Sequence, residues 1–206
     1  MEKNQVDFTV VIQAGGQSSR MGQDKALMPF LGRPLIARQV ERLRGLDAAL
    51  LVVTNRPAEY AFLGLPLAAD RVQGLGPLGG LVTAFEAAST PVVAVVACDM
   101  PFLNPALLLA QRALLEREQV DVVIPRSPEG LEPLHAVYRR EVCLPAVRQA
   151  LAEGKRRMIA WLEAVRVREM NAEEIAAADP TLRSFVNVNS PAEFRQAEEW
   201  ARAEEG

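Results

Sequence analysis

Histidine, lysine and cysteine are scarce in this chain of 206 residues. A single histidine argues against a zinc site built on histidines. The two cysteines form no C-x-x-C pair, so we expect reduced thiols and a cytoplasmic protein. A net charge of −3, with acids and bases interspersed, argues against a nucleic-acid or anionic membrane surface. No apolar run approaches the length of a membrane span, and the first residues, MEKNQVDF, lack the apolar core of a signal peptide.

Apolar runs alternate with helical patterns along the chain, which is typical of a mostly parallel sheet flanked by helices. Half of the residues are apolar, and the length suits one domain. We therefore predict a single α/β domain over residues 1–206. Strands are expected at residues 9–12, 49–54, 67–69, 92–98, 120–124, 135–138, 164–168 and 185–188. Helices are expected at residues 35–43, 79–88 and 104–118, and a last helix begins at a capping box that starts with Ser190.

The segment FTVVIQAGGQSSRMGQDKALMPFLG, residues 8–32, is the most informative part of the chain. An apolar strand runs into Gly15 and Gly16, where backbone amides can approach an anion closely. Arg20 and Lys25 follow on one short loop and supply the charges that a polyphosphate needs. The loop is neither a Walker A motif nor a G-x-G-x-x-G dinucleotide fingerprint. It predicts a nucleoside triphosphate site; the alternative is a glycine-rich turn with two solvated cations.

Further polar side chains follow other expected strands. The segment VVAVVACDMPF, residues 92–102, indicates a strand buried on both faces with Asp99 directly after it. Asn55 and Asp70 follow two other strands in the same way. Ligands of open α/β sheets bind at the carboxyl ends of strands, so we expect these groups to converge with the first loop. Mg²⁺ is the expected partner of Asp99, because it prefers few carboxylates together with phosphate oxygens and water.

Each of these assignments has a simpler alternative that the residues leave open. Asp99 could cap the helix that follows it, and Asn55 could form an Asx turn. The GLGPLGG segment, residues 74–80, could be a turn and helix start rather than a place where the backbone passes close to a base. His135 is expected to be structural rather than catalytic. The basic residues of GKRRMIAWL, residues 154–162, could contact an anionic ligand or begin a helix.

The chain resembles the molybdenum cofactor guanylyltransferases in five segments, which occur in this order and spacing: QAGGQSSRMGQDKAL, GPLGG, CDMPF, EPLHAVY and FVNVNSP. The resemblance covers nearly the whole chain. It implies a Rossmann-like, three-layer fold of the nucleotide-diphospho-sugar transferase type. It also implies transfer of GMP from GTP, with Mg²⁺, to the terminal phosphate of molybdopterin. Residues 8–125 would then bind GTP, residues 126–206 would shape the molybdopterin side, and proteins that deliver or receive the cofactor would make transient contacts.

The resemblance also implies roles for individual residues. The implied GTP-binding residues are Gln13, Ala14, Gly15, Lys25, Asn55, Asp70 and Asp99. The implied catalytic residues are Arg20, Lys25 and Asp99, with Asp99 as the metal ligand. The implied molybdopterin-binding residues are Asn187 and Asn189.

Two positions depart from the pattern of this family, and a third bears on the base. The family usually has leucine at the position of Gln13 and alanine at the position of Gly79. Related cytidylyltransferases carry a methyl group where this chain has Gly15, so a bare glycine favours a purine and hence GTP. The alternatives are a cytidylyltransferase or sugar-phosphate nucleotidyltransferase of the same superfamily, and a non-catalytic GTP-binding cofactor carrier.

Overall fold

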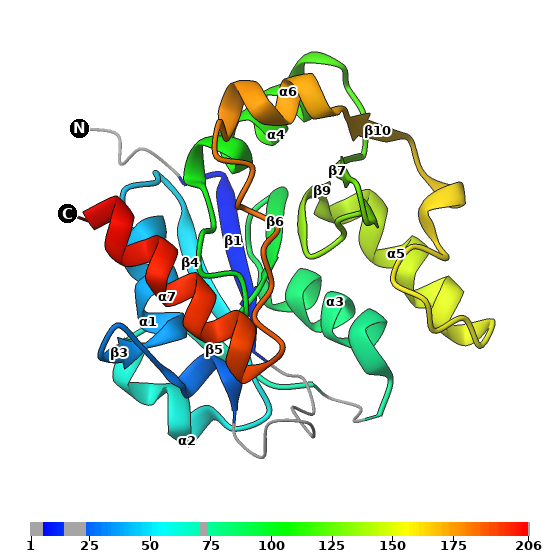
Figure 1. Cartoon of the computed structure of the whole chain (residues 1–206). Coiled ribbons are helices and arrows are strands. Elements are labelled where there is room, and N and C mark those ends of the chain that lie inside the picture. The colour runs from blue at the N-terminus through cyan, green and yellow to red at the C-terminus, as the bar shows by residue number, and fades with distance from the viewer. Residues whose placement is uncertain (1–5, 15–23, 71–73, 206) are drawn as a thin grey trace, which may run out of the picture.

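The structure is a computed structural model that describes residues 6–14, 24–70 and 74–205 (Figure 1). Its strands are β1 (Phe8–Gln13), β2 (Pro29–Phe30), β3 (Arg33–Pro34), β4 (Ala49–Val53), β5 (Leu67–Ala68), β6 (Val92–Ala97), β7 (Val122–Ser127), β8 (Gly130–Leu131), β9 (His135–Arg139) and β10 (Val167–Met170). Its α-helices are α1 (Leu35–Leu43), α2 (Pro57–Tyr60), α3 (Gly76–Ala87), α4 (Pro105–Arg117), α5 (Arg140–Ala152), α6 (Ala172–Ala178) and α7 (Pro191–Glu205). Short 3₁₀-helices are η1 (Lys25–Leu27), η2 (Ala61–Leu63) and η3 (Leu162–Ala164).

The main sheet has the strand order β10-β7-β9-β6-β1-β4-β5. Strands β6, β1, β4 and β5 run parallel to one another, and β7 and β10 also form a parallel pair. In the register, Gln13 pairs with Val53 on one side and with Ala97 on the other. The carboxyl ends of β4, β1 and β6 therefore meet at one edge of the sheet, where ligands of such sheets bind.

Helices cover both faces of the sheet, because alternate residues of a strand point to opposite faces (Figure 1). Val10 and Ile12 pack into one apolar cluster with residues of α1, α4 and α6. Val11 packs into a second cluster with residues of α3 and α5. A third cluster joins α7 to the segment before α1, where the rings of Phe30 and Phe194 meet edge to face. The predicted three-layer α/β fold is confirmed.

Several local predictions hold residue by residue. β6 is buried along its whole length. The face of α1 that the apolar spacing predicted is buried through Leu35, Ile36, Gln39, Val40 and Leu43. α7 begins at the predicted capping box: Glu193 N donates to Ser190 Oγ at 3.2 Å, and Ser190 N donates to Glu193 Oε2 at 3.0 Å.

Other local predictions are wrong or shifted. Residues 185–188 form no strand; instead Val188 N donates to the Asp99 carbonyl at 3.0 Å. The strands expected at 120–124 and 164–168 are shifted to β7 and β10. β9 is antiparallel to both of its neighbours, because the short β7–β9 connection is a hairpin-like return and a parallel crossover needs a dozen residues or more.

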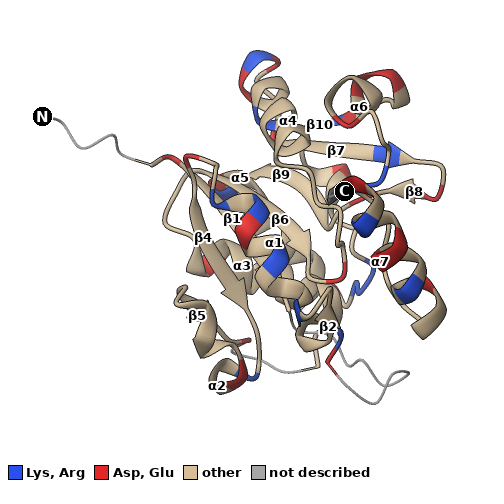
Figure 2. Cartoon of the chain, turned by 60° about the vertical axis from the view of Figure 1, so that its left-hand side comes forward, with Lys and Arg blue, Asp and Glu red and all other residues tan. Residues whose placement is uncertain are grey.

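The surface carries charges of both signs. Figure 2 shows Lys and Arg next to Asp and Glu along α1, α4 and α7. Within the described ranges, no helix combines the length and the apolar character that crossing a membrane requires.

Candidate active site

Lys25, Asp99 and Asn189 meet at the carboxyl edge of β6, although 164 residues separate the first from the last. Lys25 Nζ donates to Asn189 Oδ1 at 2.5 Å and lies 3.7 Å from Asp99 Oδ2. The Lys25 and Asp99 side chains are 16% and 22% exposed, so solvent and a ligand can reach both. Burial raises the pKa of Asp99, and the neighbouring ammonium of Lys25 opposes this shift. The capping alternative for Asp99 is wrong, because the side chain of Asn104 caps α4.

The turn that carries Asp99 is fixed from two sides. Gln39, on the buried face of α1, donates to the carbonyls of Ala97 at 2.8 Å and Met100 at 2.9 Å. The amide of Val188 binds the Asp99 carbonyl from the segment before α7. These bonds hold the carboxylate in place relative to the strand, which is what a preorganised charge requires.

A second polar cluster lies at the ends of β4 and β5. Asn55 Nδ2 donates to Asp70 Oδ2 at 3.0 Å, and Asp70 N donates to Asn55 Oδ1 at 2.9 Å. Thr83 of α3 donates to Asp70 Oδ1 at 2.7 Å. The Asx-turn alternative for Asn55 is wrong, because its amide is used in this pair. The structure thus brings Asn55 and Asp70 together, while Gly15, with which they were expected to converge, lies outside the described residues.

Gln13 and Ala14 lie between the two clusters. Ala14 N donates to the Val53 carbonyl at 2.8 Å, and Cys98 N donates to the Gln13 carbonyl at 3.1 Å. Gln13 Nε2 is buried and, within the described part of the chain, has no hydrogen-bond partner. A Cβ at Gly80 would lie 3.2 Å from Gln13 Oε1, so the glycine leaves room for this amide against α3.

The GLGPLGG segment forms a turn and the start of α3, which is the simpler of the two interpretations of its sequence. A Cβ at Gly79 would lie only 2.5 Å from the Cβ of Leu75. The alanine usual in the family therefore does not fit here without a shift of the backbone, which accounts for the departure at this position.

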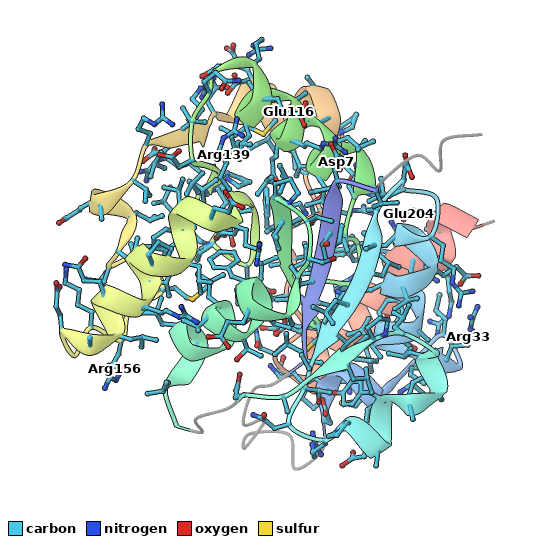
Figure 3. All side chains as sticks on the ribbon, turned by 180° about the vertical axis from the view of Figure 1, so that it is seen from behind. Asp7, Arg33, Glu116, Arg139, Arg156 and Glu204 are labelled. Atoms are coloured by element: carbon cyan, nitrogen blue, oxygen red, sulfur yellow. The ribbon has the colours of Figure 1, made fainter. Side chains whose placement is uncertain are left out.

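Some predicted site residues are placed differently or not at all. Gly15 and Arg20 lie outside the described residues. Asn187 donates to the Phe185 carbonyl at 3.2 Å, within its own segment. Residues 154–162 form turns and no amphipathic helix, and Arg156 lies at the tip of the loop after α5, where its guanidinium binds backbone carbonyls (Figure 3).

Sequence reasoning missed the residues around Asp24. Asp24 Oδ2 accepts hydrogen bonds from the Tyr60 hydroxyl at 2.5 Å and from Arg56 Nη2, and its Oδ1 accepts one from Ala26 N at 3.1 Å. The chain offered only one signal, an acidic residue directly before Lys25. Gln39 was visible as a polar residue on the apolar face of α1, and such a residue needs a buried partner.

His135 is structural, as predicted. It is fully buried on β9, its ring packs edge to face against Phe185, and its Nδ1 lies 3.4 Å from Gln111 Nε2. Burial lowers the pKa of His135 from 6.5 to about 4. Its imidazole is therefore neutral near pH 7 and does not serve as a surface base.

The buried histidine makes stability depend on pH. Between pH 6.5 and about 4 the unfolded chain binds a proton at His135 that the folded chain does not, so stability falls as the pH falls through this window. At pH 5 the loss should be roughly 2 kcal/mol. Urea unfolding at pH 7.5 and pH 5, in the wild type and in His135→Gln, measures it. We expect the variant to lack this part of the pH dependence, and equal dependence in both proteins would contradict the assignment.

Comparison with known proteins shows to which family the chain belongs. Residues 10–167 match the MobA-like NTP transferase domain. A "Probable molybdenum cofactor guanylyltransferase" of Carboxydothermus hydrogenoformans is 39% identical over 92% of this chain and 94% of its own. The "Molybdenum cofactor guanylyltransferase" of Desulfosudis oleivorans is 34% identical over the same shares. The chain belongs to the MobA-like NTP transferase family.

Solved structures agree with this membership. The molybdopterin-guanine dinucleotide biosynthesis protein A of Archaeoglobus fulgidus has a TM-score of 0.82 and 26% identity, covering 95% of this chain and 99% of that one. A CMP:2-keto-3-deoxy-manno-octonic acid synthetase has a TM-score of 0.70 at 18% identity, which shows the shared fold alone. The MobA-like protein described here is therefore a nucleotidyltransferase, and it shares its fold with both of these proteins.

Proposed function

We propose that this MobA-like protein transfers GMP from GTP to the terminal phosphate of molybdopterin and releases pyrophosphate. The observation that carries the proposal is the likeness over more than nine-tenths of both chains to relatives named molybdenum cofactor guanylyltransferase. The geometry supports it: one ammonium and one carboxylate lie side by side at the carboxyl edge of a parallel sheet. Both charges are suited to a nucleoside triphosphate that carries a metal ion.

The nucleophile of this reaction needs no base from the protein. A phosphate monoester has a second pKa of about 6, so the attacking oxygen is ionised near neutral pH. This agrees with a chain whose single histidine is buried and neutral. The protein's contribution is then to align the two substrates and to stabilise charge on the departing pyrophosphate.

Lys25 would stabilise charge on the triphosphate, and Arg20 would do so from the same loop. Asp99 would hold Mg²⁺: it offers one partly exposed carboxylate, and the described residues contain no cluster of three or more metal-binding side chains. That donor set fits a metal ion that arrives with phosphate oxygens and waters. When bound, Mg²⁺ neutralises charge on the phosphates.

The two polar clusters would contact different parts of the substrates. Gln13, Ala14 and Gly15 would contact the nucleotide, with Asn55 and Asp70 on the guanosine side. Asn55 and Asp70 pair with each other and Thr83 donates to Asp70, so both side chains are held in place at the ends of β4 and β5.

Asn187 and Asn189 would lie on the molybdopterin side. Because Asn189 already touches Lys25, the acceptor phosphate would approach the triphosphate from this segment. Two free cysteines agree with a reducing cytoplasm as the place of the reaction. Transient contacts with proteins that deliver or receive the cofactor complete the proposal.

A nucleotide panel tests the base. Pyrophosphate release is measured with Mg²⁺ and purified molybdopterin cofactor, using GTP, CTP or ATP. We expect release with GTP alone, and only when the pterin is present. Turnover with CTP would identify a cytidylyltransferase instead, and GTP binding without any release would favour the non-catalytic carrier.

A further inference from the structure

The loop that carries Lys25 is fastened to α2 by the residue directly before it. The side chain of Asp24 is 8% exposed and is held by the phenol of Tyr60, the guanidinium of Arg56 and the amide of Ala26. These three donors use both carboxylate oxygens. Asp24 thus caps η1, the 3₁₀-turn in which Lys25 is the first residue, and ties that turn to a neighbouring element.

Tyr60 gives this contact a rigid base. Tyr60 is fully buried and packs in the apolar cluster that includes residues of β1 and α1. Burial and the carboxylate of Asp24 raise the pKa of Tyr60, so its hydroxyl stays protonated and remains a donor. A hydrogen bond to a charged acceptor is stronger than one between neutral groups, so the phenol fixes the position of Asp24 firmly.

We propose that Asp24 is a positioning residue, anchored by Tyr60 and Arg56, that fixes where the ammonium of Lys25 meets the triphosphate. The inference rests on the proposed role of Lys25. It goes beyond that role because it assigns a task to Asp24, Tyr60 and Arg56, to which the proposed function gives none.

The contacts of Asp24 with Tyr60 and Arg56, called the Asp24 anchor below, also connect the guanosine side of the site with the molybdopterin side. Arg56 follows Asn55 in the chain, and Asn55 pairs with Asp70 on the guanosine side. A continuous set of contacts therefore runs from the guanosine side through Asp24 to Lys25 and Asn189. Misplacing a reacting or charge-stabilising group by about 1 Å can cost a hundredfold in rate, so such a network has catalytic consequences.

The two tyrosines of the chain offer a matched test. Both hydroxyls are donors from fully buried rings: Tyr60 to Asp24 at 2.5 Å, and Tyr138 to the Pro133 carbonyl at 2.6 Å. Tyr60→Phe and Tyr138→Phe each remove one buried hydroxyl. We expect both variants to lower the melting temperature by a few degrees, because each loses one hydrogen bond.

Of the two tyrosine variants, only Tyr60→Phe should change the chemistry. We expect its kcat to fall about fivefold, and its affinity for GTP to fall about threefold relative to its affinity for GMP, because only GTP carries the phosphates that Lys25 would meet. Tyr138→Phe should keep the wild-type kcat and affinity ratio. Asp24→Asn keeps the shape of the side chain and loses its charge, and its kcat should fall about tenfold.

The proposed role of Asp24 would be wrong if Tyr60→Phe had the same kcat as Tyr138→Phe and the same ratio of GTP affinity to GMP affinity. The affinity ratio separates this failure from failure of the proposed function. If the panel identifies another nucleotide, the ratio is measured with that triphosphate and its monophosphate. A changed ratio then supports the anchor although the base assignment is wrong, and an unchanged ratio refutes it.

Discussion

Lys25→Ala should fold normally and turn over about a hundredfold more slowly than the wild type at saturating GTP and acceptor. Removing one preorganised charge at a site of charge development costs roughly 3 kcal/mol of transition-state stabilisation. The Nζ atom of Lys25 lies within 4 Å of both Asp99 and Asn189, so its charge is already held where the substrates would meet. Initial rates of pyrophosphate release measure the effect.

Lys155→Ala is the matched control for this variant. Lys155 pairs with Glu153 at 3.0 Å on the loop after α5, and its side chain is exposed. An exposed ion pair contributes little, so this variant should keep both the stability and the rate of the wild type. A Lys25→Ala protein that retains full activity would remove Lys25 from the mechanism.

Asp99→Asn should also lose about a hundredfold in rate, but its stability should be unchanged or higher. Burial disfavours the charged form of Asp99, which is why its pKa is raised, and a neutral amide of the same shape avoids that cost. The amide is a weaker ligand for Mg²⁺ than a carboxylate, so the Mg²⁺ concentration for half-maximal rate should rise. Rates across a magnesium titration, together with thermal unfolding, measure both effects.

Asp7→Asn makes the same chemical change at the amino end of β1, on the side of the sheet away from the candidate site. Asp7 pairs with Arg112 at 2.8 Å and is exposed just before the strand begins (Figure 3). We expect its rate and its magnesium dependence to equal those of the wild type. If Asp99→Asn behaved in the same way as Asp7→Asn, Asp99 could not be the metal ligand.

The parts of the fold that sequence predicted well are those set by neighbours in the chain. The uncharged run of β6 predicted a strand buried on both faces, and Asp99 then had to lie at its carboxyl end. The spacing of Ser190 and Glu193 predicted the start of α7, because a capping box is completed within four residues.

The parts that sequence could not predict depend on distant contacts. Residues 185–188 have the apolar composition of a strand, but their backbone binds the turn at Asp99 instead of a sheet edge. The short connection from β7 explains why β9 is antiparallel to β7, but its place beside β6, a strand about forty residues earlier in the chain, is encoded by no local pattern. The contact between Lys25 and Asn189 spans 164 residues, and the resemblance could suggest only that both lie near the substrates.

The most direct test of the account follows the α-phosphorus of GTP. GTP labelled at the α-phosphate is incubated with the enzyme, Mg²⁺ and purified molybdopterin cofactor, and GTP labelled at the γ-phosphate is run in parallel. The account predicts that the α-label moves to the pterin product while all released γ-label is found in pyrophosphate. An α-label that stays in GTP, or that appears in free GMP without joining the pterin, would contradict guanylyl transfer.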